Sequence, residues 1–148
     1  MKRILQILVI TVLGCYIFTS CEKDNGIGSI EDLLGTYNVT VEDYVIWGAD
    51  SGTIYDKGTI TITKIDNNRV QLRGLISTKG TLDGGELYLD STTNTDSYGY
   101  ITRTYDRVLF GGGILTIFSN ATGQLSTTPN GTRYPYSSSC YFEGRKMD

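Results

Sequence analysis

The chain of 148 residues carries 13 lysines and arginines, 16 aspartates and glutamates and no histidine, which gives a formal charge of −3. This acidic balance leaves no basic footprint for nucleic acid, so we expect no nucleic-acid partner. The lack of histidine in the sequence excludes a Ser-His-Asp triad, a Cys-His pair and a zinc site of ordinary type. We expect no metal, no cofactor and no enzymatic activity.

The chain begins with a basic segment that leads into an apolar one. Met1-Lys2-Arg3 precedes a nearly uninterrupted apolar run over residues 4–20, and the sequence becomes polar directly after Cys21. This order is typical of a secretory signal. An uncleaved membrane helix is the less favoured alternative, because a run of about 17 residues lies at the lower limit for spanning a bilayer.

The residues before Cys21 resemble the signal of a bacterial lipoprotein, with small side chains at Thr19 and Ser20. The resemblance implies a signal peptide over residues 1–20, acyl chains such as palmitate on Cys21, and a flexible tether over residues 21–28. Several acyl chains would hold the protein stably on a membrane. Cys15 is the competing acceptor, but cleavage there would leave an apolar stretch at the new terminus.

The segment Cys21-Glu22-Lys23-Asp24-Asn25 is similar to the tether of surface-exported lipoproteins of the Bacteroidetes type. That resemblance implies an outer-membrane, lipid-anchored protein that is exposed at the cell surface. Retention on the periplasm-facing side is the alternative.

Residues 29–148 have the length of one domain and a composition that favours strands. The whole chain contains 18 glycines and 11 tyrosines but only 2 prolines. Ser29, with an acid three residues later at Asp32, predicts one capped helical turn that ends near Gly35. From Thr36 onward the apolar residues alternate with polar ones, which indicates strands.

The alternation and the turn residues predict a series of short strands in chain order. Tyr37, Val39 and Val41 share one face, and the sequence Asp83-Gly84-Gly85 is a strong hairpin signal. We expect residues 48–52, 91–96 and 120–123 to form turns or loops. The predicted strands cover residues 36–47, 59–65, 69–75, 76–82, 86–90, 98–110, 114–118, 124–127 and 134–146.

Eight to ten consecutive strands without crossover helices predict an all-β, antiparallel up-and-down meander. Closing about eight strands into a barrel would remove the exposed edges, whereas a two-sheet β-sandwich is the alternative. The opening helical turn, Gly35-Thr36-Tyr37 and the late basic pair Arg145-Lys146 resemble the calycin group of lipocalin-like and avidin-like barrels. The resemblance implies a barrel in which Arg145 or Lys146 packs across Tyr37, and it implies no particular ligand.

The side chains that could recognise a ligand are aromatic or basic. Small barrels can hold one ligand at their mouth, lined by aromatic and a few polar groups. The candidate ligand-binding residues are Trp47, Tyr55, Tyr100, Arg103, Tyr105 and Tyr136, with Tyr98, Arg107 and Tyr134 as further members of the same group. For each tyrosine the competing interpretation is a strand residue that fills or braces the sheet.

Two further residues have modest signals. Asp90-Ser91-Thr92 resembles the acceptor used for O-glycosylation in exported proteins of the Bacteroidetes type, which would place a sugar on Ser91. Cys140 has no partner for an internal disulfide if Cys15 is removed and Cys21 is acylated. We expect Cys140 to be a small buried core residue.

Two functions remain open from the sequence. The first is a lipid-anchored cell-envelope protein that binds a small apolar ligand or glycan through its barrel. The second is a protein-interaction or structural subunit of an outer-membrane complex, with a solid core and no small-molecule ligand.

Overall fold

The computed structural model describes residues 26–148, so the predicted signal peptide and Cys21 lie outside the described residues. Within this range the chain forms one short helix, α2 (Ile30–Leu33), and nine strands in one sheet. The strands are β1 (Gly35–Trp47), β2 (Asp50–Lys64), β3 (Arg69–Gly74), β4 (Thr78–Asp83), β5 (Glu86–Leu89), β6 (Thr92–Asp96), β7 (Gly99–Gly111), β8 (Ile114–Leu125) and β9 (Tyr134–Lys146).

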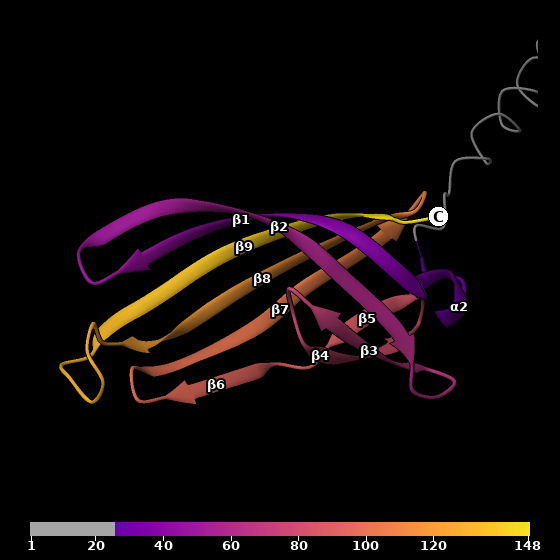
Figure 1. Cartoon of the computed structure of the whole chain (residues 1–148). Helices are drawn as coiled ribbons and strands as arrows, with labels where there is room; N and C mark the ends of the chain where they lie inside the picture. Colours follow the sequence, from indigo (N-terminus) through magenta and orange to yellow (C-terminus); the bar gives the residue numbers. More distant parts are fainter. Residues whose placement is uncertain (1–25) are drawn as a thin grey trace, which may run out of the picture.

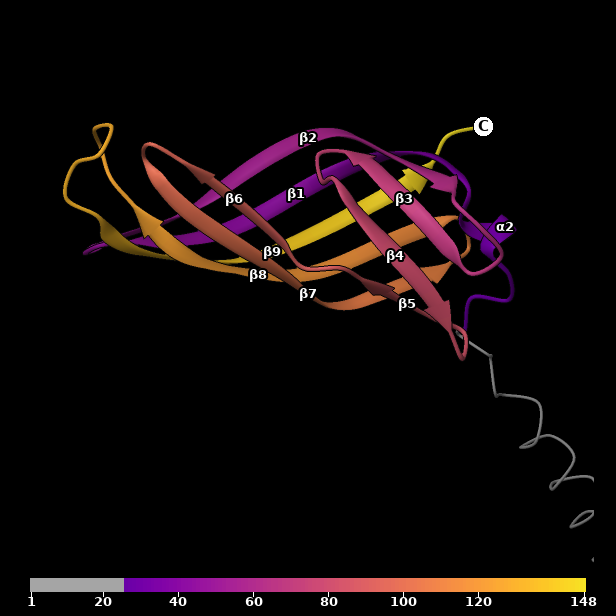
Figure 2. The ribbon, with the colours of Figure 1, turned by 90° about the horizontal axis from the view of Figure 1, so that it is seen from below.

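The sheet confirms the predicted all-β, antiparallel up-and-down fold. Its order is β5-β4-β3-β2-β1-β9-β8-β7-β6, so the first and last strands pair with each other. The sheet curls until β3, β4 and β5 lie opposite β7 and β8 at the end that carries α2 (Figures 1 and 2). The backbone ladders of the described residues stop at β5 and β6, which leaves an open seam in the barrel-like curl.

The two ends of the molecule differ because the strands differ in length. Strands β1, β2, β7, β8 and β9 have 12 to 15 residues, whereas β3, β4 and β5 have 4 to 6. The short strands lie near α2, and the long strands continue past them together with β6 (Figure 1). One end is therefore curled closed around a core, and the other is an open, curved sheet.

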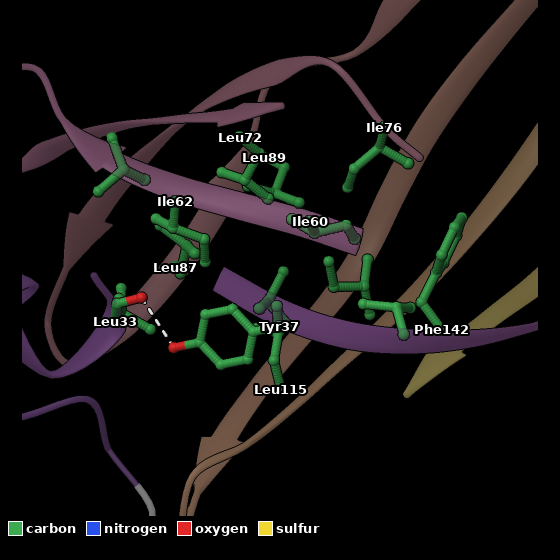
Figure 3. Close-up of a cluster of buried hydrophobic side chains, with 14 of the residues drawn as sticks. Leu33, Tyr37, Ile60, Ile62, Leu72, Ile76, Leu87, Leu89, Leu115 and Phe142 are labelled. Atoms are coloured by element: carbon green, nitrogen blue, oxygen red, sulfur yellow. Dashed lines mark hydrogen bonds between the residues drawn. The ribbon is translucent and has the colours of Figure 1, made fainter. Parts of the chain in front are cut away.

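The closed end is filled by apolar side chains around Tyr37, which is fully buried. The hydroxyl of Tyr37 donates a 2.7 Å hydrogen bond to the carbonyl of Leu33, the last residue of α2 (Figure 3). Ser29 and Asp32 form the predicted capping box at the start of this helix. The largest fully buried side chains are Leu33, Tyr37, Ile60, Ile62, Val70, Leu72, Leu115 and Ile117. A core packed in this way leaves no room for a ligand among its side chains.

The late basic residues Arg145 and Lys146 lie near Tyr37 in the register of the sheet. Lys146 lies directly opposite Tyr37 in the β1–β9 ladder, and its Nζ donates to the carbonyl of Asp32 at 3.2 Å. Arg145 lies opposite Asn38 and is exposed. Lys146 thus joins the end of β9 to the helix that covers the core.

One predicted turn is wrong and two predicted turns or loops are shorter than expected, because strands pass through these segments. Residues 120–123 belong to β8, where β7 and β9 hold them from both sides. The turn after Trp47 is confined to Gly48 and Ala49, because β2 begins at Asp50 and pairs with β1 along its length. Residues 92–96 form β6, which pairs with the first half of β7. In each case pairing with a neighbouring strand outweighs the local preference for a turn.

Candidate functional site

The core-facing side of the sheet continues beyond the filled core as the concave surface of the open end. Residues directly opposite each other in an antiparallel pair point to the same face. Because Tyr37 and Val41 face the core, the alternation along β1 carries Asp43, Val45 and Trp47 onto this same face. We call the concave surface beyond Val41 the trough.

Four of the predicted ligand-binding residues lie on the trough side of the sheet. Trp47 and Tyr136 are opposite each other in the β1–β9 ladder, and both are half-buried. Arg103 and Tyr105 are opposite Ala121 and Ser119 of β8, which face inward. The indole Nε1 of Trp47 donates to the carbonyl of Leu125 at 3.4 Å. The structure therefore brings these four residues onto one concave face.

Two of the predicted residues lie on the opposite, convex face. Tyr55 is opposite Glu42, and its side chain is 74% exposed. Tyr100 is opposite Gln124 and is also exposed. Arg107 also lies on the convex face. An extra residue in β7 between Tyr105 and Arg107 shifts the register, so Tyr105 and Arg107 point to opposite faces. The side chains of Tyr55, Tyr100 and Arg107 cannot touch a ligand held in the trough.

Arg103 marks the boundary between the filled core and the trough. Its Nη1 donates a 2.9 Å hydrogen bond to Ser119, and its Nη2 lies 3.9 Å from Asp43 Oδ2. The guanidinium also lies over the ring of Phe142, 5.9 Å from the ring centre. Since β7 and β1 are separated by β8 and β9, the side chain of Arg103 reaches across the concave surface. Three contacts therefore hold the guanidinium of Arg103 in place.

Two polar atoms beside Arg103 have no hydrogen-bond partner among the described residues. Asp43 Oδ1 and Ser138 Oγ are both buried and unpaired. The side chain of Asp43 is 17% exposed, and Ser138 as a residue is only 5% exposed. Buried polar groups in folded proteins are nearly always hydrogen-bonded, so such atoms require an explanation.

A pocket of about 180 Å³ opens beside Asp43, and Ser138 is not among the residues that line it. Asp43, Arg103 and Cys140 line one side of it, and Ile54 and Asp56 of β2 line another. Its volume is below the roughly 300–1,000 Å³ of pockets for drug-sized ligands, yet well above the roughly 30 Å³ that one water occupies. It has room for one small ring or for the end of a longer ligand.

Sequence reasoning missed Asp43 and Ser138, although the sequence holds a signal for each. Asp43 continues the alternation of Tyr37, Val39 and Val41, so a carboxylate there falls at a core-facing position. Ser138 lies midway between Tyr136 and Cys140, so alternation along a strand puts all three on one face. A polar residue at a strand position where the alternation predicts an inward-facing apolar residue is the pattern that identifies buried polar side chains of this kind.

Cys140 is buried, as predicted, and lies opposite Asp43. Desolvation raises the pKa of its thiol to about 11, and the nearby Asp43 carboxylate adds to the shift. A thiol with so high a pKa is almost entirely protonated at neutral pH and reacts slowly. Cys140 therefore contributes a small apolar wall to the pocket.

A second hollow, of about 410 Å³, follows the open seam of the sheet. The backbone turn at Gly84–Gly85 and the strand β5 line one side, and residues 105–110 of β7 line the other. Tyr105 faces this hollow, and burial raises the pKa of its hydroxyl. Tyr105 thus lies between the seam and the trough.

Ser91 is exposed in the short connection between β5 and β6, as its predicted loop position requires. Cys21 and Cys15 lie outside the described residues. Among residues 26–148, no cluster of acidic or cysteine side chains has the arrangement of a metal site. None of the helices in this part of the chain is long and apolar enough to cross a membrane.

No protein-family model and no curated protein sequence matches this chain. Among solved structures, the chain is similar to the S-type phycobiliprotein lyase CPES from Guillardia theta, with 9% sequence identity and a TM-score of 0.40. The match covers 87% of this chain and 98% of the lyase. A likeness this remote assigns no role to any residue of the trough.

Proposed function

We propose that this protein is a non-catalytic binding protein whose trough receives a small molecule, either a glycan or the end of an apolar ligand. The observation that carries the proposal is the gathering of Trp47, Tyr136 and Arg103 on one concave face, with Arg103 also lining the pocket. Aromatic faces with a few fixed polar groups are the usual lining of ligand sites. The core around Tyr37 is filled with side chains, so we place the ligand on the concave face of the open end.

The proposal places the protein on the outer membrane through acyl chains on Cys21, facing the cell surface. The support for this location is the sequence before and after Cys21. A tethered binding protein would present its trough to ligands outside the membrane. The periplasm-facing arrangement remains the alternative, and it leaves the ligand site unchanged.

A second function, docking to a protein of an outer-membrane complex, has support on the convex face. Tyr44 and Ile46 of β1 are exposed there, 47% and 41% respectively, together with Phe118 of β8. Phe118 packs against Tyr141 with ring centres 5.2 Å apart. Exposed aromatic groups of this kind are enriched at protein interfaces.

Trp47 makes the two functions separable, because it is the only tryptophan in the chain and lies in the trough. Adding a small molecule that binds the trough should change the intensity or wavelength of the Trp47 emission. We expect a saturable change with members of a panel of glycans and lipids, and no change with a protein that binds the convex face. A silent panel, together with a stoichiometric partner recovered from outer membranes, would favour the second function.

A further inference from the structure

We propose that the outer edge of β2 pairs with the same edge of a second copy of this chain, so that two open-ended sheets join into one. The inference goes beyond the proposed ligand binding and does not depend on it. At the open end the sheet has two edges, β2 on one side and β6 on the other (Figure 1). Strand β3 pairs only with residues 60–64 of β2. Residues 50–58 of β2 therefore have no neighbouring strand on their outer side within residues 26–148.

The hydrogen bonds of β2 show which backbone groups face this outer edge. The carbonyl of Thr59 accepts a 3.0 Å hydrogen bond from Leu75 N–H, and Ile65 N–H donates to the carbonyl of Arg69 at 2.8 Å. Both bonds lie on the β3 side, and both involve odd-numbered residues of this part of the chain. In a regular antiparallel strand the N–H and C=O of one residue point to the same side, and successive residues alternate. The backbone groups that point outward, away from β1, therefore belong to Ser51, Thr53, Tyr55 and Lys57.

These eight backbone groups, two from each of four residues, form an almost unpaired edge. Among the described residues, the one partner is the side chain of Asp56, which accepts from Lys57 N–H at 2.7 Å. All four residues are exposed, and the β1–β2 ladder runs past them without a register shift. Such an edge is a template for another strand, and folded proteins usually interrupt it with a proline or a bulge. Residues 50–58 contain neither, so the edge is regular over its whole length.

A second copy supplies a strand that matches this edge in one symmetric register. A two-fold axis relates the copies, so residue i contacts residue j and j contacts i. With Ile54 opposite its own copy, Ser51 faces Lys57 and Thr53 faces Tyr55. All outward groups of the two copies then pair with each other in eight main-chain hydrogen bonds. This number is within the range of about ten, give or take five, that a typical protein interface carries.

The two neighbouring symmetric registers are less favourable. A shift of one residue in each copy toward the β1–β2 turn brings Asp50 opposite Asp56, and like charges directly opposite are destabilising. The reverse shift places Ser51 opposite Thr59, whose carbonyl already accepts a hydrogen bond from Leu75. With Ile54 opposite itself, the charged residues Asp50, Asp56 and Lys57 face the uncharged residues Gly58, Gly52 and Ser51.

The exposed side chains beside the edge also gain partners in this register. Ile54 is 57% exposed on the concave face, and Tyr55 is 74% exposed on the convex face. The two Ile54 residues form a non-hydrogen-bonded pair, in which the Cα atoms are about 4.5 Å apart. The ring of Tyr55 lies across from Thr53 of the other copy, and such cross-strand pairs stabilise sheets. The joined sheet carries both troughs on the same face.

Cysteine cross-linking of the full chain tests this register. In Ile54→Cys the two introduced residues lie opposite each other, within the Cα spacing of roughly 4.4–6.8 Å that a disulfide needs. Tyr55→Cys is the matched control, because each introduced residue lies opposite Thr53 and is a diagonal neighbour, about 7–8 Å from its own copy. Non-reducing gel electrophoresis after a short oxidation measures the linked dimer. The unaltered chain shows any background from its own cysteines.

A proline substitution tests the main-chain hydrogen bonds of the edge. Thr53→Pro removes an outward N–H that the β1–β2 ladder does not use, and edge strands tolerate proline at such a position. Thr95→Pro is the matched control on the β6 edge. The carbonyl of Tyr98 accepts from Ser126 N–H on the β8 side, and alternation along the β6–β7 ladder then directs the N–H of Thr95 outward. Each proline is combined with Ile54→Cys, and urea unfolding checks that the variants are folded.

We expect Ile54→Cys to form a disulfide-linked dimer that a reductant separates. Tyr55→Cys and the unaltered chain should remain monomeric on the gel. Addition of Thr53→Pro should lower the amount of linked dimer about tenfold or more, because each dimer loses two hydrogen bonds, one from each copy. Addition of Thr95→Pro should leave the dimer unchanged.

Three results would overturn the inference: no linked dimer from folded Ile54→Cys, equal linking of Tyr55→Cys, or a dimer that Thr53→Pro leaves unchanged. A disulfide between Ile54→Cys and a different protein would assign this edge to another partner, and would also overturn it. All of these results concern the edge of β2 alone. The ligand titrations of the trough therefore succeed or fail independently of them.

Discussion

Tyr37 links the helix to the sheet through one side chain. Its ring is fully buried in the core, 6.4 Å from Phe110 in an edge-on arrangement, and its hydroxyl donates to the carbonyl of Leu33. That carbonyl lies at the end of α2, where a helix has no partner of its own for its last carbonyls. One residue therefore fills the core and also ends the helix.

Replacing Tyr37 by phenylalanine should lower the free energy of unfolding by about 1–2 kcal/mol at pH 7, because the buried Leu33 carbonyl loses its donor. Burial also raises the pKa of Tyr37 to about 12 from 10.0. The unfolded chain ionises first, so the part of the stability that depends on neutral Tyr37 is present below pH 10 and is lost as the pH rises to 12.

Urea unfolding of the unaltered chain and of Tyr37→Phe, from pH 7 to pH 12, measures both effects. The stability difference between the two should shrink or reverse above pH 10. Tyr55→Phe is the control, because Tyr55 is 74% exposed and should change the stability by less than about 0.5 kcal/mol. A difference between Tyr37→Phe and the unaltered chain that is constant with pH would contradict this account of Tyr37.

At the scale of the elements, alternation in the sequence predicts strand faces well where one face is apolar. The spacing of Tyr37, Val39 and Val41 predicts that they share one face, and the structure confirms it with all three buried in the core. The prediction of a turn at residues 120–123 is wrong, although Asn, Thr and Gly are residue types typical of turns. These residues pair with both β7 and β9, and this pairing depends on residues distant in the sequence. Local composition carries no information on it.

The sequence alone also does not predict which face of the sheet each tyrosine occupies. Tyr55 is odd-numbered in a strand whose core residues, Ile60 and Ile62, are even-numbered. That parity puts Tyr55 on the convex face, but only once residues 50–64 are known to be one unbroken strand. In β7 the extra residue between Tyr105 and Arg107 changes the parity within the strand. Sequence alone does not locate such a bulge.

Gly123 tests whether β8 is continuous through this segment. A Cβ atom at Gly123 would overlap the carbonyl oxygen of Tyr100 in the neighbouring strand β7. Gly123→Ala should therefore destabilise the protein by about 2–4 kcal/mol in urea unfolding. Gly111→Ala is the matched control, because nothing lies within 4 Å of a Cβ built there. Equal stability of the two variants would show that residues 120–123 form the turn that local composition predicts.

At the scale of the whole molecule, the filled end and the open end follow from strand length. The short strands β3, β4 and β5 complete the curl near α2, and the long strands leave the trough beyond them (Figure 2). The sequence predicts the number and order of the strands approximately, but it does not reveal where the curl stops being closed. The residues at the base of the trough were missed because their burial depends on this shape.

The lipid anchor concerns the whole molecule too, because it decides where the trough operates. In the full chain expressed in a bacterium that processes lipoproteins, Cys21→Ser should abolish labelling by a fatty-acid probe and release the protein from the membrane fraction. Cys15→Ser is the matched control and should keep the label. Loss of label in Cys15→Ser, with retention in Cys21→Ser, would assign the anchor to Cys15.

The central claim is that the concave face of the open end is the binding surface. Nuclear magnetic resonance of the ¹⁵N-labelled full chain, titrated with the glycan and lipid panel, tests it most directly. The account predicts shifts at the Trp47 indole and at the amides of Asp43 and Ser138, with the convex Tyr55 and Phe118 unaffected. Shifts confined to the convex residues, or to the seam between β5 and β7, would contradict it.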